Sequence, residues 1–158
     1  MVMSRCQFDA AALDTAVSDG DRQAQRALLR RAQHSVRQAL RLAASVARER
    51  VEAYRLAGQV CWLAGKRRRA VHCWEQSIRA AEQLGARPDL ARTYFEMGRR
   101  LGAAGLGQRM VNQLPGAAYV DKALELFAQL GLDADRQQAA VDGADGAMAA
   151  PKGRAAAA

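Results

Sequence analysis

The chain has 158 residues, of which 50% are hydrophobic and only 5% aromatic, as in a globular domain whose core is built from alanine and leucine. It has no stretch near the roughly 20 apolar residues of a membrane-spanning helix, no apolar leader and no CxxC pair among its three cysteines, so we expect a cytoplasmic protein without disulfides. The net charge of +8 is concentrated in residues 22–110, which hold 19 of the 24 basic residues and six of the 16 acidic ones.

Residues 1–21 predict an N-terminal segment with one short, weakly amphipathic helix over residues 9–18. Gly20 suits the left-handed end of that helix, and Asp21 suits the N-cap of the next one. A long amphipathic helix is predicted from Arg22 to about Ala47, because no Gly or Pro interrupts the apolar periodicity. Its arginines share one stripe opposite the apolar side: Arg22, Arg26, Arg30, Arg37, Arg41 and Arg48.

The middle of the chain repeats itself. Seven of the fourteen residues in 30–43 recur 38 positions later, in 68–81. A second echo, at 40 residues, links Tyr54, Gly58, Ala64 and Gly65 to Tyr94, Gly98, Ala104 and Gly105. Periods of this size with helical spacing indicate stacked helical hairpins. We therefore predict an all-α fold in which antiparallel helical hairpins stack as a short solenoid.

Two clear helix pairs follow the long helix, which itself has the segment at 9–18 as a weak partner. The short Gly-containing break at 63–66 predicts antiparallel neighbours in the first clear pair. The next pair opens with Pro88 at a first helical position, and about six extra residues near 106–114 predict a loop before its second helix, around 116–130. The repeat domain thus spans 22–136. The alanine-rich residues 137–158 predict a disordered tail.

The spacing Tyr54-x2-Ala57-Gly58-x2-Cys61-x8-Ala70-x3-Trp74-x2-Ser77 resembles the tetratricopeptide repeat (TPR). The period is longer than the usual repeat of about 34 residues. Repeats of this longer kind are similar to the C-terminal helical arrays of bacterial signalling proteins that combine a cyclase or kinase domain with an ATPase module. Residues 91–101 and 119–127 are similar to the terminal repeat of those proteins. The resemblance covers roughly residues 22–136.

The resemblance implies a non-catalytic module for protein–protein interaction in signal transduction, with a peptide-binding groove lined by the first helix of each pair. Carried over one position at a time, the groove residues are Glu52, Arg55, Gln59, Trp62, Arg92, Phe95 and Arg99. A mainly basic groove would suit an acidic protein or peptide segment, although the asparagines of the carboxylate-clamp version are absent. Trp62 is expected to be a contact anchor and Trp74 a core residue.

No motif predicts catalysis, a cofactor or a metal site. The stretch from Gly58 to Lys66 lacks the spacing and the Ser or Thr of a phosphate-binding loop. His34 and His72 occupy equivalent places in the first echo, yet no four-ligand set emerges. Cys61 takes the place of a packing residue, so we expect it to be a small buried hydrophobe and not a nucleophile.

Nucleic-acid binding is the alternative function, through the arginine stripe and the run Lys66–Arg69, because phosphate contacts require only positive charge. No nucleic-acid-binding motif accompanies that charge. A short array also leaves dimerisation open, since about three repeats are needed for stability. A short array is equally consistent with the chain being the C-terminal part of a larger signalling protein.

Overall fold

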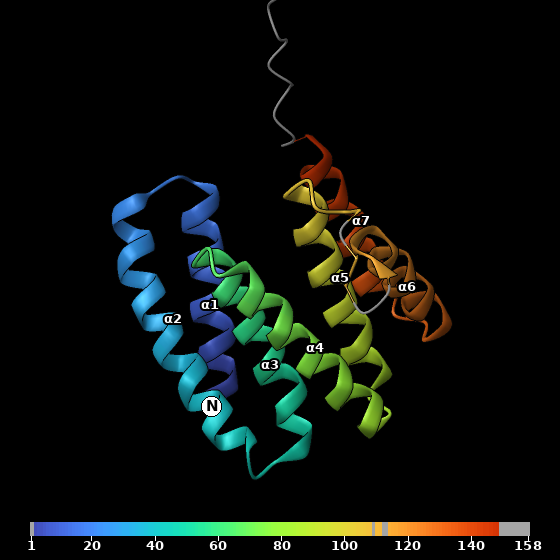
Figure 1. Ribbon diagram of the computed structural model, residues 1–158, viewed down its shortest axis with the longest axis horizontal. Coiled ribbons are helices and arrows are strands. Elements are labelled where there is room, and N and C mark those ends of the chain that lie inside the picture. Colours follow the sequence, from blue (N-terminus) through green and yellow to red (C-terminus); the bar gives the residue numbers. More distant parts are fainter. Residues whose placement is uncertain (1, 109, 112–113, 149–158) are drawn as a thin grey trace, which may run out of the picture. The chain divides into compact units, whose positions relative to one another are not determined.

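The structure, a computed structural model, describes residues 2–108, 110–111 and 114–148, and within them the chain is almost entirely helical (Figure 1). The predicted all-α class is confirmed. The helices are α1 (Val2–Ser18), α2 (Arg22–Ala43), α3 (Ala47–Leu63), α4 (Arg67–Leu84), α5 (Arg87–Ala103), α6 (Gly116–Gln129) and α7 (Asp133–Met148). Two compact units divide the chain, Met1–Thr93 and Tyr94–Ala158, and each is described by itself.

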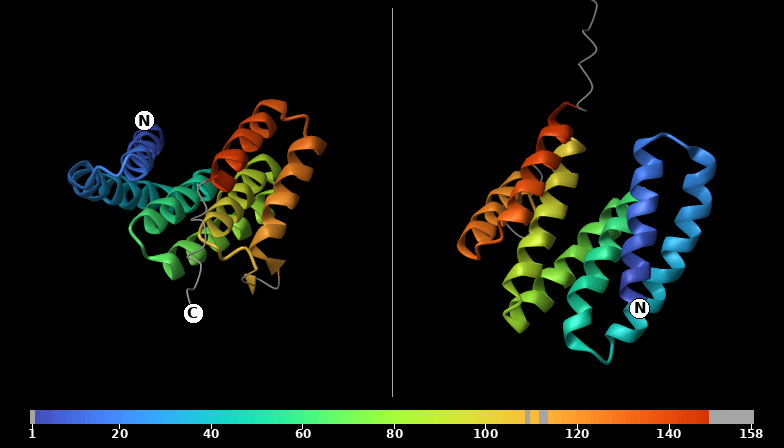
Figure 2. Two further views of the ribbon diagram at one scale, coloured as in Figure 1. Left: turned by 90° about the horizontal axis from the view of Figure 1, so that it is seen from above. Right: turned by 180° about the vertical axis from the view of Figure 1, so that it is seen from behind.

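In the first unit, α1 and α2 form a helical hairpin (Figure 2). Gly20 joins them with a positive φ of 73°, and the Asp21 side chain accepts hydrogen bonds from the backbone amides of Gln23 and Ala24, at 3.0 and 2.9 Å. The predicted helix over residues 9–18 is wrong at its start, because α1 already begins at Val2. Cys6 is fully buried and extends the apolar stripe by one turn.

The inner side of the first hairpin also holds a buried carboxylate. Asp9 is completely buried, accepts a hydrogen bond from Ser35 Oγ, and its Oδ1 lies 2.6 Å from Arg31 Nε. The side chain of Arg31 is 49% exposed, whereas that of Asp9 is 1% exposed. A charge inside the apolar stripe of α1 is tolerated because both carboxylate oxygens face a polar neighbour.

The predicted long helix ends earlier than expected, at Ala43, and a short turn separates it from α3. No Gly or Pro is needed for this stop. Side chains satisfy the last carbonyl groups: Ser45 Oγ donates to Leu42 O at 2.9 Å, and Arg50 Nη2 donates to Ala44 O at 3.4 Å. Arg48 therefore belongs to the first turn of α3 and not to the long helix.

The hairpin of α3 and α4 confirms the predicted short break, with Gly65 at a φ of 73°. The two helices approach closely where Gly58 faces Trp74. A β-carbon on Gly58 would lie 2.3 Å from Trp74 Nε1, so only glycine leaves room for the indole there. Trp74 is fully buried, as expected for a core residue. The remaining core of these two hairpins is mostly alanine, which lets helices pack at short range: Ala10, Ala32, Ala39, Ala43, Ala53 and Ala57.

The first turns of α5 belong to the same unit and are held by buried hydroxyls. Ser77 Oγ donates to Val51 O at 2.8 Å and lies 3.0 Å from Thr93 Oγ1, which in turn donates to Asp89 O at 2.9 Å. Both hydroxyls are fully buried. Their hydrogen bonds connect α3, α4 and α5 through the interior without leaving either group unsatisfied.

The second unit contains the rest of α5, a small antiparallel ribbon and two further helices. The predicted loop near 106–114 includes strands β1 (Met110–Val111) and β2 (Leu114–Pro115), in which Met110 pairs with Pro115 and Val111 with Leu114. Tyr119 of α6 fixes this ribbon, because its hydroxyl donates to Val111 O at 2.7 Å. The Tyr119 ring also lies 5.4 Å from that of Tyr94.

The predicted disordered tail is wrong for residues 137–148, which belong to α7, while residues 149–158 lie outside the described residues. Alanine is the strongest helix former, and Asp133 and Asp135 in the first turn favour the positive end of the helix dipole. Ala139 is buried, so α7 has a packed side as well. The alanine-rich composition of residues 137–148 thus favours a helix instead of a disordered tail.

Candidate interaction surface

The first helices of the first two hairpins, α1 and α3, lie side by side in the first unit (Figure 1). Gln7 Nε2 donates to Glu52 Oε1 at 3.0 Å, and Gln59 Nε2 donates to Asp14 Oδ2 at 3.3 Å. Both contacts join residues 45 positions apart. Since the two contacts also lie two helical turns apart on each helix, α1 and α3 are parallel and in register.

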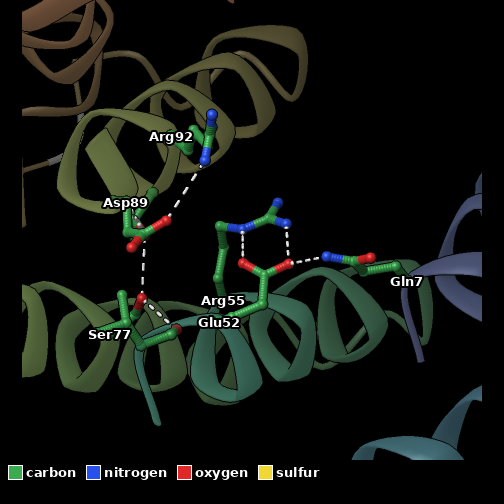
Figure 3. Close-up of polar contacts among 8 residues, drawn as sticks. Gln7, Glu52, Arg55, Ser77, Asp89 and Arg92 are labelled. Atoms are coloured by element: carbon green, nitrogen blue, oxygen red, sulfur yellow. Dashed lines mark hydrogen bonds and ion pairs between the residues drawn. The ribbon is translucent and has the colours of Figure 1, made fainter. Parts of the chain in front are cut away.

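The polar side chains of this surface form what we call the polar stripe: Gln7, Asp14, Glu52, Arg55, Gln59, Asp89 and Arg92. Figure 3 shows Glu52 of this stripe with its partners Gln7 and Arg55. Arg55 makes a bidentate contact with the Glu52 carboxylate: Nε donates to Oε2 at 2.7 Å, and Nη2 donates to Oε1. Burial acts to raise the pKa of Glu52, but the hydrogen bonds and charge of Arg55, the hydrogen bond from Gln7 and the charge of Arg92 outweigh it. The pKa of Glu52 is therefore below its ordinary value of 4.5.

Arg92, on the exposed side of α5, lies 3.5 Å from Asp89 Oδ1, also visible in Figure 3. Each predicted groove arginine of the first unit thus has a carboxylate beside it. The positive field of Arg55 and Arg92 is compensated locally, so this stripe is polar and nearly balanced in charge.

Trp62 lies at the other end of α3 and is half-buried. Its ring centroid is 5.7 Å from that of Trp74, and the guanidinium carbon of Arg67 lies 5.2 Å from the Trp62 ring centroid. Contact with a cation and a second indole holds the ring in place while leaving part of it open to solvent. An aromatic ring in that setting suits a contact anchor.

The two remaining predicted groove residues, Phe95 and Arg99, belong to the second unit and are both half-buried. Arg99 and Arg100 flank the buried Glu96, at 3.1 and 2.9 Å. Burial acts to raise the pKa of Glu96, but the charges of Arg100 and Arg99 and their hydrogen bonds lower it below its ordinary value. Five of the seven predicted residues lie in the first unit: Glu52, Arg55, Gln59, Trp62 and Arg92. The structure brings Arg55 and Arg92 near Glu52, whereas Trp62 lies at the other end of α3.

Sequence reasoning missed Gln7, Asp14 and Asp89, which complete the stripe. The offset of 45 between α1 and α3 exceeds the 40-residue echo mainly because α2 has 22 residues where α4 has 18, and the turn that follows α2 is one residue longer. The seven-residue spacing of Gln7 and Asp14, matched by Glu52 and Gln59, was the available signal. It was hidden by the late start predicted for the first helix.

A second surface is the exposed side of α2, which holds six arginines and no acidic residue. Arg31 lies against Asp9, and the other five are exposed: Arg22, Arg26, Arg30, Arg37 and Arg41. The run Lys66–Arg69 at the start of α4 is exposed as well. These residues carry much of the positive charge of the first unit.

Among the residues that the structure describes, no group of three or more His, Cys, Asp and Glu side chains could hold a metal ion. His34 and His72 are both exposed. Within the same residues, no helix has the length and apolarity required to cross a bilayer. Comparisons with protein-family models, with curated proteins and with solved structures found no match.

Proposed function

We propose that this protein is a non-catalytic interaction module of the TPR-like kind, which binds a protein or peptide segment along α1 and α3. The observation that carries the proposal is the in-register pairing of these two helices through Gln7–Glu52 and Asp14–Gln59. Parallel first helices with matched polar side chains form a surface along which an extended peptide can make repeated contacts.

The two echoed glycines support the relation to TPR-like hairpins. Gly58 faces Trp74 in the first unit, and Gly98 faces Val120 in the second, where an added β-carbon would lie 2.7 Å from Val120 Cγ2. The same residue type thus allows the same close approach of paired helices, 40 positions apart. On the same resemblance, we further propose that the protein acts in cytoplasmic signalling, as the C-terminal part of an ATPase or cyclase protein.

Trp62 is the residue on which we expect binding to depend most. Its ring is half-buried and contacts Trp74 and Arg67, so part of it remains open to solvent. Arg55 and Arg92, in contrast, already have carboxylate neighbours. A partner segment with an apolar or aromatic side chain next to acidic residues would contact the ring and the neighbouring basic run together.

A peptide library displayed on phage and selected on the full chain tests this proposal. Enriched peptides should bind Trp62→Ala at least about tenfold more weakly than the unchanged protein, as expected for an aromatic hot spot. Leu84→Ala, an exposed apolar residue at the far end of α4, is the matched control and should bind normally. Circular dichroism checks that both variants fold. Equal binding to all three proteins, or no enrichment, would overturn the proposal.

The basic side of α2 favours nucleic-acid binding as a second candidate, because its five exposed arginines have no acidic residue on their own helix. Fluorescence anisotropy with labelled single-stranded and duplex oligonucleotides tests it at two salt concentrations. Binding through phosphates should weaken steeply with salt and with the triple change Arg22→Gln, Arg26→Gln and Arg30→Gln. Oligonucleotide binding without any peptide binding would replace the leading proposal.

A further inference from the structure

A pocket of about 120 Å³ opens between α2, α3 and α4, and two of the three cysteines line it. Cys61 comes from the last turns of α3 and Cys73 from α4. Leu40 and Val60 form part of its apolar wall. Within the described part of the chain, no residue of α1 lines the pocket, and no residue of the polar stripe does so either. The pocket is therefore distinct from the polar stripe.

Three cationic residues of the described ranges line the pocket together with the two thiols. Arg37 comes from α2, Lys66 from the turn before α4, and Arg69 from the first turn of α4. No carboxylate is among the described residues that line this pocket. A thiolate is therefore the only anion that its lining residues can supply, and it would sit in a positive field.

The two thiols are close enough to interact, and they are not equivalent. The hydrogen bond from Cys73 is the largest influence on Cys61; burial opposes it, while Arg69 and Lys66 add to it, and together they lower the pKa of Cys61 to about 7. The same contact and burial raise the pKa of Cys73. Cys61 is thus the more readily ionised thiol of the two, and Cys73 is the less readily ionised one.

Cys6 provides an internal comparison. It is fully buried under α1, and burial, with the charges of Asp9 and Glu52, raises its pKa to about 12. A buried thiol without a pocket or a positive environment is unreactive. The three thiols therefore differ: Cys61 is the most readily ionised, Cys73 is its neighbour in the pocket, and Cys6 is buried and unreactive.

We propose that Cys61 and Cys73 are a redox-active pair, a modification site at which a hydroperoxide converts the two thiols to a disulfide between α3 and α4. The inference does not depend on the proposed peptide-binding function. It adds to the expected packing role of Cys61, which packs against the core and also lines the pocket, where a small oxidant could reach its sulfur.

The reaction has two steps. The Cys61 thiolate attacks the O–O bond of the hydroperoxide; an S–O bond forms, and the distal oxygen leaves as hydroxide (from hydrogen peroxide) or alkoxide, which takes up a proton. The product is Cys61 sulfenic acid. The sulfur of Cys73 then attacks Cys61 Sγ and loses its proton, the S–O bond breaks, and the hydroxyl group leaves with that proton as water. With hydrogen peroxide, two thiols and one oxidant give one disulfide and two waters.

Lys66 and Arg69 assist the first step in two ways. They favour the thiolate before reaction, and they stabilise the negative charge that develops on the leaving oxygen. The pocket is open to solvent and has a volume of about 120 Å³, which is ample for a small oxidant. Hydrogen peroxide is therefore the probe that matches the site best.

Peptide mapping of the full chain tests the proposal directly. Trypsin cuts at the basic run Lys66–Arg69, so Cys61 and Cys73 fall in separate peptides, 56–66 and 70–79. After treatment of reduced protein with hydrogen peroxide, these two peptides should appear linked, lighter by two hydrogen atoms than their sum, and should separate again with dithiothreitol. Cys6 should remain free and alkylatable.

Single variants distinguish the roles. Cys73→Ser should leave Cys61 as a sulfenic acid that dimedone traps, whereas Cys61→Ser should leave Cys73 as a thiol, and Cys6→Ser should form the disulfide normally. The pH profile of iodoacetamide alkylation gives a second readout: the rate at Cys61 should reach half its maximum near pH 7. The profile should shift to higher pH in Cys73→Ala, which cannot donate the hydrogen bond to Cys61. Equal oxidation of all three cysteines, persistent sulfenic acid in the unchanged protein, or purely intermolecular disulfides would overturn the proposal.

Discussion

Gly58 and Trp74 are complementary in shape, since a β-carbon on Gly58 would lie 2.3 Å from the indole nitrogen of Trp74. Glycine inside a helix costs roughly 0.5–1 kcal/mol relative to alanine. Glycine is nevertheless required at position 58, because the fully buried indole of Trp74 occupies the volume that a β-carbon would need. The contact links a residue of the 40-residue echo to the largest side chain of the core.

Gly58→Ala should therefore destabilise the protein despite the better helix propensity of alanine. Displacing a buried indole should cost about 1–3 kcal/mol, as in other overpacked cores. Gly102→Ala is the matched control: Gly102 is also in a helix, is exposed and has nothing within 4 Å of an added β-carbon, so it should stabilise slightly. Urea unfolding followed by far-ultraviolet circular dichroism measures both. An unchanged midpoint for Gly58→Ala would contradict the close contact.

Arg31→Gln should leave Asp9 as a buried carboxylate without its cation. Because the Arg31 side chain is half exposed, we expect a loss of about 1–3 kcal/mol, less than for a fully buried ion pair. Arg30→Gln removes the same charge from the adjacent, exposed position and should change the unfolding free energy by less than about 0.5 kcal/mol. Similar midpoints for the two variants in urea would show that Arg31 does not stabilise Asp9.

Acid should weaken the fold through Glu52 and Glu96, whose pKa values are lowered in the folded protein. Their contribution is fully present above the ordinary pKa of 4.5 and is lost as pH falls through the lower folded value. The unfolding free energy should thus decline below about pH 5. Glu52→Gln should flatten that decline, whereas Glu82→Gln, at an exposed position, should not. Denaturation at a series of pH values provides the test, and parallel curves for all three proteins would contradict it.

Tyr119→Phe should loosen the ribbon of the second unit, because it removes the buried hydrogen bond from the Tyr119 hydroxyl to Val111 O. The expected cost is about 1–3 kcal/mol. Hydrogen exchange measured by mass spectrometry should become faster in residues 106–115. Tyr54→Phe serves as control, since the described residues offer no hydrogen-bond partner for the Tyr54 hydroxyl. Unaltered exchange in the ribbon would exclude this anchoring role.

Helical periodicity and turn glycines were sufficient to predict the helix pairs from sequence. Gly20, Gly65 and Gly131 all lie at helix ends with positive φ, because few other residues adopt that conformation. The start of α1 was not predictable in this way, since Asp9 interrupts the apolar stripe and its burial depends on Arg31 and Ser35, which are distant in sequence. The end of α2 was missed because its stop signal is a side chain, that of Arg50.

The candidate surface was predicted in part, with residues found on α3 but not on α1. A repeat pattern identifies positions on one helix, so Glu52 and Gln59 were found from the spacing on α3. Their partners on α1 were missed, because the register between two helices depends on the length of everything that connects them. The longer α2 changes that length, so the offset between α1 and α3 does not follow from the echoes at 38 and 40.

The only two tryptophans of the chain, Trp62 and Trp74, contact each other within a single hairpin, with ring centroids 5.7 Å apart. Intrinsic tryptophan fluorescence therefore reports on α3 and α4 and is insensitive to events confined to residues 94–158. An emission change and an ellipticity change that occur at different denaturant concentrations would mean that the two halves of the polypeptide melt independently.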